Sequence, residues 1–369
     1  MIPVSEPNIG KEELDNIIEA VQSGWISSMG KFTGEFEANF ADYCGVRFGV
    51  ACVNGTAALH LALIALGIGK GDEVIVPDLT FIASANTVLF TGAKPVFIDS
   101  DPDYWCINPG KIEGAITSNT KAIIPVHLYG HPCDMDAITS IAQRHHLFII
   151  EDAAQAHGST YKGKMVGSFG HISCFSFHAI KLITTGEGGM CLTNDEKLAI
   201  KMKTLRDHGM NASKKYSHDL IGFNYRLTNL QAAIGVAQLK KISGFLDRKR
   251  YISDHYISLL RDIPGLTLPT EKSWAKSNHW VNALLVEDGF GIDRDSLMER
   301  LLENGIETRN MLIPMDQQPV YQGMDFMLQK HDFPVAHALR EKGLYLPSSL
   351  KLSDGDIDYI CDTIKKLSK

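Results

Sequence analysis

The sequence of 369 residues has little of several features that mark whole classes of protein. It has no excess of basic residues: the formal net charge is −7 and the pI is about 6.1, so the chain as a whole does not attract nucleic-acid phosphates or anionic membranes. The seven cysteines are odd in number and include no CxxC pair, which argues against a disulfide framework or a zinc ribbon. We therefore expect a cytoplasmic protein without a nucleic-acid partner.

Long apolar runs are also missing. The longest, Ala57 to Gly69, is broken by His60 and is too short to cross a bilayer. The first 15 residues lack a basic region followed by an apolar stretch, so we expect a soluble, unprocessed protein that does not engage a membrane.

Two motifs of phosphate and metal chemistry are absent. No GxxxxGK[ST] loop occurs, which disfavours a P-loop ATPase, and no HExxH occurs. His127 and His131 are four residues apart, and His145 and His146 are adjacent, but His131 precedes a proline in a predicted turn. A structural or substrate-contacting role suits these histidines better than metal ligation, and no metal site is predicted.

Short apolar and β-branched runs recur through the first half of the chain. Helix-like segments separate most of them, for example residues 56–66, 81–90 and 135–145, and this alternation predicts an α/β fold with a largely parallel sheet covered on both faces. The seven predicted strands are residues 48–53, 73–77, 95–99, 121–127, 147–151, 172–177 and 189–193.

After Asn194 the pattern changes. A long helical stretch, residues 227–260, ends before Pro264, and a smaller α+β region follows. That region is predicted to hold a strand at 279–287, a helix at 294–304 and a last helix at 354–367, which Ser353 caps. We expect a large domain of residues 1–245 and a small C-terminal domain of residues 246–369, with the hinge within the long helix.

Lys181 and Asp152 suggest pyridoxal phosphate (PLP) chemistry. A lysine amine can hold the cofactor aldehyde as a Schiff base, and a carboxylate keeps the pyridine nitrogen protonated. Asp152 follows an apolar strand, where ligands bind in open α/β sheets, and Lys181 stands 29 positions later, before a glycine-rich run. A helix cap at Glu151 or Asp152 explains the acidic pair equally well, and a lone lysine is usually a surface residue.

A phosphate site is predicted at the start of the helix after the first strand. Asn54, Gly55, Thr56 and Ala57 would present backbone amides and a hydroxyl there. For the Asn-Gly-Thr string alone, an ordinary helix cap is the simpler interpretation. The glycines of residues 67–71 follow a helix and precede a strand, the reverse of a dinucleotide-binding turn, and predict a helix stop.

Several strings, in this order, carry a family resemblance: GTAALHLAL, EDAAQAHGSTYKGKMVGSFG, FSFHAIK, TTGEGG and GFNYRLTNLQAAIGVAQL. They resemble the sugar aminotransferases of the DegT/DnrJ/EryC1/StrS family, and the resemblance runs from Ile2 through the final helix. It implies the fold type I, aspartate aminotransferase-like architecture of PLP-dependent transferases, with a seven-stranded, mostly parallel sheet.

The resemblance also implies roles around the cofactor ring. Lys181 would form the Schiff base and act as the catalytic residue, and Asp152 would bind the pyridine nitrogen. Gln155 would lie beside the phenolic oxygen, and Phe81 would stack on the ring face.

For the phosphate, the resemblance implies Gly55, Thr56, Ala57 and Ser176 of one subunit. Asn224 would reach it from the neighbouring subunit. The enzyme would then be a homodimer with shared active sites, or a tetramer built from such dimers.

The resemblance further implies the reaction. An amino group from L-glutamate would pass through pyridoxamine phosphate to carbon 4 of a nucleotide-linked 4-keto-6-deoxysugar, with a GDP-linked sugar favoured, in the synthesis of O-antigen or another polysaccharide. Asp316 stands where relatives commonly carry a histidine, and Ile313 where they carry an aromatic residue. The candidate substrate contacts are Trp25, Ser27, Lys31, His178, Arg309 and Asp316.

Other functions stay open. The ketosugar could be linked to dTDP or UDP, or aminated at carbon 3. Dehydration of a deoxysugar is a third possibility, although relatives that catalyse it carry a histidine in place of the lysine that this chain keeps at position 181. A non-catalytic scaffold or regulator is the alternative from another class, and such a protein would not need the whole cofactor set.

Overall fold

The computed structural model describes residues 1–211, 213–327 and 332–368. Its first half forms a seven-stranded sheet of order β1-β9-β8-β5-β4-β2-β3, in which β9 runs antiparallel to both of its neighbours and the other pairs are parallel. Each predicted strand overlaps one of these seven, so the α/β prediction is confirmed. The strands are β1 Phe48–Cys52, β2 Glu73–Pro77, β3 Lys94–Ile98, β4 Thr120–Ile123, β5 Phe148–Asp152, β8 Ile172–Ser176 and β9 Gly189–Thr193.

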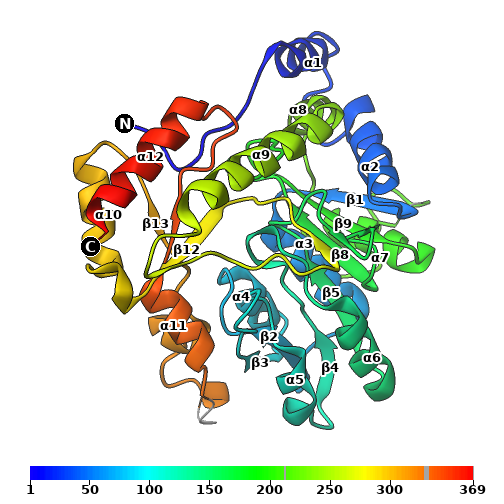
Figure 1. The fold of residues 1–369 in the computed structure, drawn as a ribbon. Helices are drawn as coiled ribbons and strands as arrows, with labels where there is room; N and C mark the ends of the chain where they lie inside the picture. The colour runs from blue at the N-terminus through cyan, green and yellow to red at the C-terminus, as the bar shows by residue number, and fades with distance from the viewer. Residues whose placement is uncertain (212, 328–331, 369) are drawn as a thin grey trace.

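Helices cover both faces of the sheet (Figure 1). Side chains alternate between the faces: Cys174 packs in a core with α3, whereas its neighbour Phe175 packs in a second core with α2 and α8. This burial on both sides explains why the strands are continuously apolar. The helices of this part are α1 Lys11–Gln22, α2 Lys31–Tyr43, α3 Gly55–Leu66, α4 Ala83–Phe90, α5 Pro109–Ile112, α6 Met135–His145, α7 Glu196–Arg206 and α8 Asn229–Lys240.

The prediction of one continuous helix over residues 227–260 is wrong. The chain forms α8 and then α9, Ile242–Leu260, with Lys241 between them at φ −98° and ψ −2°. The Lys241 ammonium pairs there with the buried carboxylate of Glu13 in α1. A contact with a segment more than 200 residues away fixes this break, and local helix propensity does not report it.

The second half adds a four-stranded sheet of order β10-β12-β14-β13 beside the large one (Figure 1). Its own core joins α9 to residues such as Leu284, Leu297 and Ile360. Trp280 and Met315, however, pack into a core of the large sheet, and the boundary at residue 245 stays a prediction. The elements are β10 Leu266–Thr267, β12 Asn282–Val286, β13 Arg309–Asn310, β14 Gly343–Leu346, α10 Arg294–Glu303, α11 Pro334–Lys342 and α12 Asp354–Leu367.

The predicted ends of several helices are confirmed. Ser353 caps α12 by accepting a hydrogen bond from the Asp356 amide at 3.1 Å, and Gly67 ends α3 in the left-handed conformation at φ 83°. A small third sheet was not predicted: it pairs β11 Ala275–Lys276 with the hairpin of β6 Thr160–Tyr161 and β7 Lys164–Met165. Among the described residues, no helix combines the length and the apolar character needed to cross a membrane.

Candidate active site

A cavity of about 380 Å³ lies where the carboxyl ends of β5 and β8 meet the start of α3 and residues of the small sheet. Asp152 and Ser176 are the last residues of their strands, and Lys181 follows five residues after Ser176. The structure therefore brings most of the predicted cofactor residues to one place. The cavity lining includes Gly55, Thr56, Phe81, Asp152, Gln155, Ser176, His178 and Lys181.

Asp152 is buried and held at both carboxylate oxygens. Ser84 donates to Oδ2 at 2.7 Å, and the amide of Ala154 donates to Oδ1 at 3.2 Å. Burial raises the pKa of Asp152, and these two hydrogen bonds oppose the rise. A protonated pyridine nitrogen would favour the ionised carboxylate, because an opposite charge offsets the cost of burial.

Lys181 lines the cavity and lies against the indole of Trp280, with Nζ 4.0 Å from a ring centroid. Among the residues that the structure describes, none donates to or accepts from Nζ in a hydrogen bond. Burial lowers the pKa of Lys181 to about 8, although Asp152 favours the charged form. An amine with this pKa is partly unprotonated near neutral pH, and it can attack an aldehyde or carry a proton.

The start of α3 also lines the cavity. Gly55 approaches Ser176 so closely that a β-carbon at position 55 would lie 2.7 Å from Ser176 Cβ. Asn54 caps the helix by accepting a hydrogen bond from the Ala57 amide at 2.8 Å, so the Ala57 N–H is already used. Ala57 is also buried, behind the residues that line the cavity. The helix-cap interpretation of this string is confirmed; Gly55 and Thr56 line the cavity, and the phosphate site there stays a prediction.

Gln155 presents a defined group to the cavity. The amide of Tyr129 donates to Gln155 Oε1 at 2.6 Å, so the side-chain oxygen is occupied and the NH₂ group is left to face a ligand. Tyr129 itself has φ 53°, which places its backbone close to the strand end. Phe81 is 56% exposed, as expected of a ring with an open face towards a ligand.

The neighbouring acid, Glu151, has a structural role. Its carboxylate accepts from the amides of Gly167, Phe169 and Gly170 and from Ser173, and it pairs with His127 at 3.1 Å. Burial alone would raise its pKa, but these partners outweigh burial, so the pKa of Glu151 is lowered. Neither Glu151 nor Asp152 caps a helix. The helix-cap interpretation, which the sequence left equal to the cofactor interpretation, is therefore wrong.

The two histidines weighed as metal ligands are engaged by the protein. His127 Nε2 contacts Glu151, and its Nδ1 accepts from the Cys133 amide at 3.0 Å. His131 Nδ1 contacts the Pro132 carbonyl at 2.7 Å, and its Nε2 accepts from the Lys272 amide at 3.2 Å. Both rings therefore organise loops.

The predicted substrate contacts are dispersed. His178 lines the cavity, with Nε2 3.6 Å from Glu187. Trp25 and Lys31 line a separate surface hollow near α1, and Ser27 is exposed beside it. Two others lie in the second half: Arg309 is exposed and pairs with Glu307 at 2.5 Å, and Asp316 contacts His337 at 2.8 Å. Their roles in binding substrate stay predictions.

Sequence analysis missed several lining residues. Tyr129, Trp280 and Tyr345 line the cavity although they come from three distant segments, and Ser84 positions Asp152 from α4. One local signal was present: Thr80 and Ser84 are four residues apart, both follow β2, and their hydroxyls lie 3.1 Å from each other. Nothing local indicates the aromatic residues.

These residues fit PLP. The cavity offers an amine at one end and a buried carboxylate that keeps acceptor capacity. It also offers a helix start that Gly55 leaves open for an anion, and a Cβ at that position would close the space.

Comparison with known proteins points the same way. The DegT/DnrJ/EryC1/StrS aminotransferase family matches residues 7–365. GDP-perosamine synthase of Caulobacter vibrioides is 46% identical over 360 residues, with 97% of this chain and 96% of that protein covered. GDP-perosamine synthase of Escherichia coli O157:H7 is 44% identical, with 99% and 98% covered.

A solved structure of Spr1654 from Streptococcus pneumoniae in its PLP form superposes with a TM-score of 0.94 at 31% identity, and covers 99% of this chain and 98% of that one. Fold, site and relatives agree with the resemblance to PLP-dependent aminotransferases. The chain belongs to the DegT/DnrJ/EryC1/StrS aminotransferase family and is a PLP-dependent enzyme.

Proposed function

We propose that this enzyme transfers an amino group from L-glutamate to carbon 4 of GDP-4-keto-6-deoxymannose and so forms GDP-perosamine. The observation that carries the proposal is the placement of Lys181 and Asp152 in one cavity of a chain that is 46% and 44% identical to two GDP-perosamine synthases over nearly its whole length. The product would serve polysaccharide synthesis in the cytoplasm.

In this proposal PLP, when bound, supplies an aldehyde that accepts an amino group and a ring that accepts electrons from the substrate carbon. Asp152 holds the proton on the ring nitrogen. Gly55, Thr56 and Ser176, with the positive end of α3, bind the phosphate.

With PLP bound, Lys181 would be the group that carries a proton between the cofactor and the substrate carbon, for glutamate and for the ketosugar. Its pKa of about 8 suits this role, because proton transfer is fastest when the base titrates near the working pH. Trp280 limits the access of water to Nζ by covering it.

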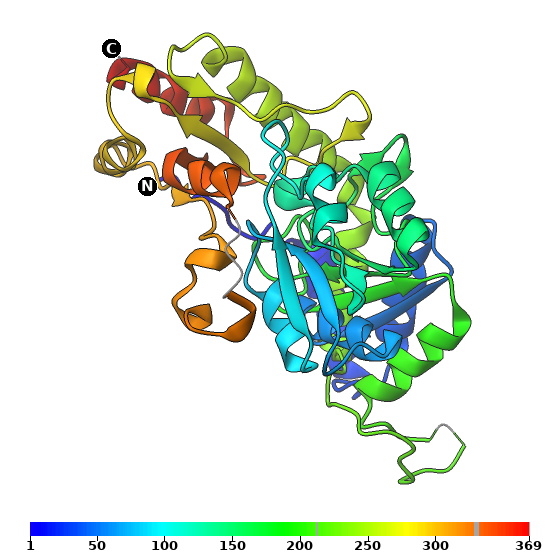
Figure 2. The same ribbon diagram turned by 90° about the horizontal axis from the view of Figure 1, so that it is seen from below.

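We propose a homodimer in which Asn224 of the partner subunit completes the phosphate site. In one chain Asn224 is exposed and lies outside the cavity lining. It lies in the segment between α7 and α8, which projects from the body of the molecule (green, Figure 2). That segment carries the apolar side chains Tyr216 and Ile221 at 77% and 94% exposure, which supports burial against a second chain.

The experiment is a panel of GDP-, dTDP- and UDP-linked 4-keto-6-deoxysugars incubated with the PLP-loaded enzyme and glutamate. Product analysis by mass spectrometry and NMR would identify an amine at carbon 4. We expect kcat/KM for the GDP sugar to exceed the others by at least about tenfold. Equal rates on all three would refute the GDP preference, and an aminosugar substituted at carbon 3 or a deoxygenated sugar would refute the proposed reaction.

A further inference from the structure

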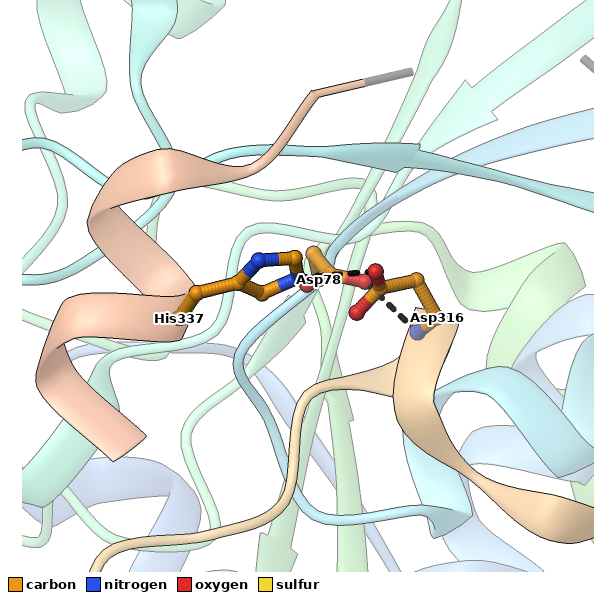
Figure 3. A group of neighbouring side chains, drawn as sticks. All are labelled: Asp78, Asp316 and His337. Carbon is orange, nitrogen blue, oxygen red and sulfur yellow. Dashed lines mark hydrogen bonds and ion pairs between the residues drawn. The ribbon is translucent and has the colours of Figure 1, made fainter. Parts of the chain in front are cut away.

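Three potential metal-ligating side chains converge outside the PLP cavity lining. They are Asp78, which directly follows β2, Asp316 in a short 3₁₀ helix at residues 315–317, and His337 in α11 (Figure 3). One ligating atom from each lies within 4.8 Å of the other two. His337 Nε2 is 2.8 Å from Asp316 Oδ2.

The backbone holds all three positions independently of any ligand. The amide of Asp316 donates to Asp78 Oδ1 at 2.9 Å, and the amide of Met315 donates to the Asp78 carbonyl at 2.8 Å. His337 is fixed through its helix, because the amide of Ala336 donates to Asp99 Oδ1 at 2.9 Å at the end of β3. The cluster is therefore preorganised by three anchored segments.

Two carboxylate oxygens in the cluster lack a partner among the described residues. Asp78 Oδ2 and Asp316 Oδ1 are buried and make no hydrogen bond, and Asp78 has 0% of its surface exposed. A fully buried carboxylate with an unused lone pair, beside a second carboxylate, is stabilised by a positive charge next to it.

We propose that Asp78, Asp316 and His337 bind a divalent transition-metal ion, with Zn²⁺ as the fitting member of the class. Two carboxylate oxygens and one imidazole nitrogen are a common ligand set for such ions, and one atom from each residue lies within 4.8 Å of the others, so small side-chain shifts would bring all three to one ion. The imidazole ligand, with two carboxylates as the oxygen ligands of the cluster among the described residues, makes Mg²⁺ and Ca²⁺ poor fits. The ion completes its shell with water, because Asp316 and His337 are partly exposed.

The ion would join the large sheet to the second half of the chain. Asp78 is two residues before Thr80, and Asp316 is four residues after Leu312, and both Thr80 and Leu312 line the PLP cavity. A bound ion would clamp these two walls together, and its three ligands lie outside the lining of the cavity that contains Lys181. This inference does not rest on the identity of the sugar, and it gives Asp316 a ligand role in place of the sugar contact predicted from sequence.

The test measures zinc in the untagged, PLP-loaded enzyme. After incubation with excess Zn²⁺ and dialysis, elemental analysis should find one ion per chain. His337→Gln and Asp316→Asn should each weaken zinc affinity by more than about tenfold in a chelator competition. Co²⁺ should give the visible absorption of a nitrogen and oxygen site in the wild type and lose it in both variants.

His255→Gln is the matched control. His255 pairs with Asp358 at 3.0 Å on the surface, a histidine–carboxylate pair like His337 and Asp316 but without a buried second acid. This control should bind zinc as the wild type does. The proposal would be overturned if the wild type lost its zinc on dialysis, or if both cluster variants kept one zinc per chain. Loss of zinc from the wild type would mean that a shared proton, and not an ion, supplies the charge that Asp78 and Asp316 need.

Discussion

Lys181 and Lys249 both contact Trp280, and burial lowers the pKa of both, to about 8 and about 7. Their surroundings differ in one respect. Lys249, in α9, donates from Nζ to the carbonyl of Trp280 at 2.7 Å and to the carbonyl of Ser348. Lys181 faces the indole ring and the cavity, and no described residue hydrogen-bonds to its Nζ.

The comparison separates a structural lysine from a reactive one. Burial makes both amines easier to deprotonate, but only an amine without fixed acceptors is available to a ligand. Lys249 ties the strand region around Trp280 to α9 and so positions the ring that covers Lys181. A low pKa alone would therefore identify the wrong lysine as readily as the right one.

The largest effect is expected from Lys181→Ala. Turnover should fall by at least about a thousandfold, because the variant loses both the group that holds PLP and the proton carrier. The visible absorption of lysine-bound PLP should disappear with it. Lys249→Met is the control and should keep the absorption of lysine-bound PLP. Loss of that absorption in Lys249→Met but not in Lys181→Ala would mean that Lys249, and not Lys181, holds PLP.

Asp152→Asn should have the next largest effect. The neutral amide cannot hold the proton on the ring nitrogen, so kcat should fall by roughly a hundredfold or more. PLP should still bind, since Lys181 and the start of α3 are intact, and absorbance titration would show this. Wild-type turnover in the purified variant would contradict the role given to Asp152.

Lys249→Met should act on stability. The carbonyls of Trp280 and Ser348 lose their donor, so the free energy of unfolding should fall by about 1–3 kcal/mol in urea denaturation. A change below about 0.5 kcal/mol would show that the buried amine contributes little.

The pH dependence of stability sharpens the same comparison. Burial lowers the pKa of Lys249 from 10.5 to about 7, so the unfolded chain binds this proton more tightly than the folded one. The free energy of unfolding should therefore rise as pH rises from about 7 towards 10.5, and level off below pH 7. Between pH 7 and 10.5 the free energy of unfolding should rise less steeply with pH in Lys249→Met than in the wild type. An equal slope in the two proteins would show that Lys249 does not cause the rise.

The smallest effect is expected from Trp280→Leu. The indole covers Nζ and so contributes to the burial that lowers the pKa of Lys181, and with a smaller side chain the pKa of the amine should rise towards its ordinary value. The rate of PLP capture by cofactor-free enzyme, followed against pH, would report the midpoint. Trp280→Phe keeps an aromatic face and should shift the midpoint less.

Sequence reasoning located the strands and the capped helices because their signals are local. Apolar runs mark the seven strands of the large sheet, and Asn54 and Ser353 mark helix starts. Asp152 and Ser176 could be placed together because both end neighbouring parallel strands of that sheet.

The missed features all depend on distant segments. The break at Lys241 follows from Glu13, the cover over Lys181 comes from Trp280, and the acidic cluster joins Asp78 to a residue 238 positions away. No periodicity or spacing within one segment encodes such contacts. They appear only when segments that are distant in the sequence pack together.

The most direct test of the central claim is to find which lysine holds PLP. The loaded enzyme would be treated with sodium borohydride, which fixes the cofactor covalently to its lysine, and digested for peptide mapping by mass spectrometry. The account predicts a single pyridoxyl group on Lys181. A label on Lys249 or on any other lysine, with Lys181 unmodified, would contradict it.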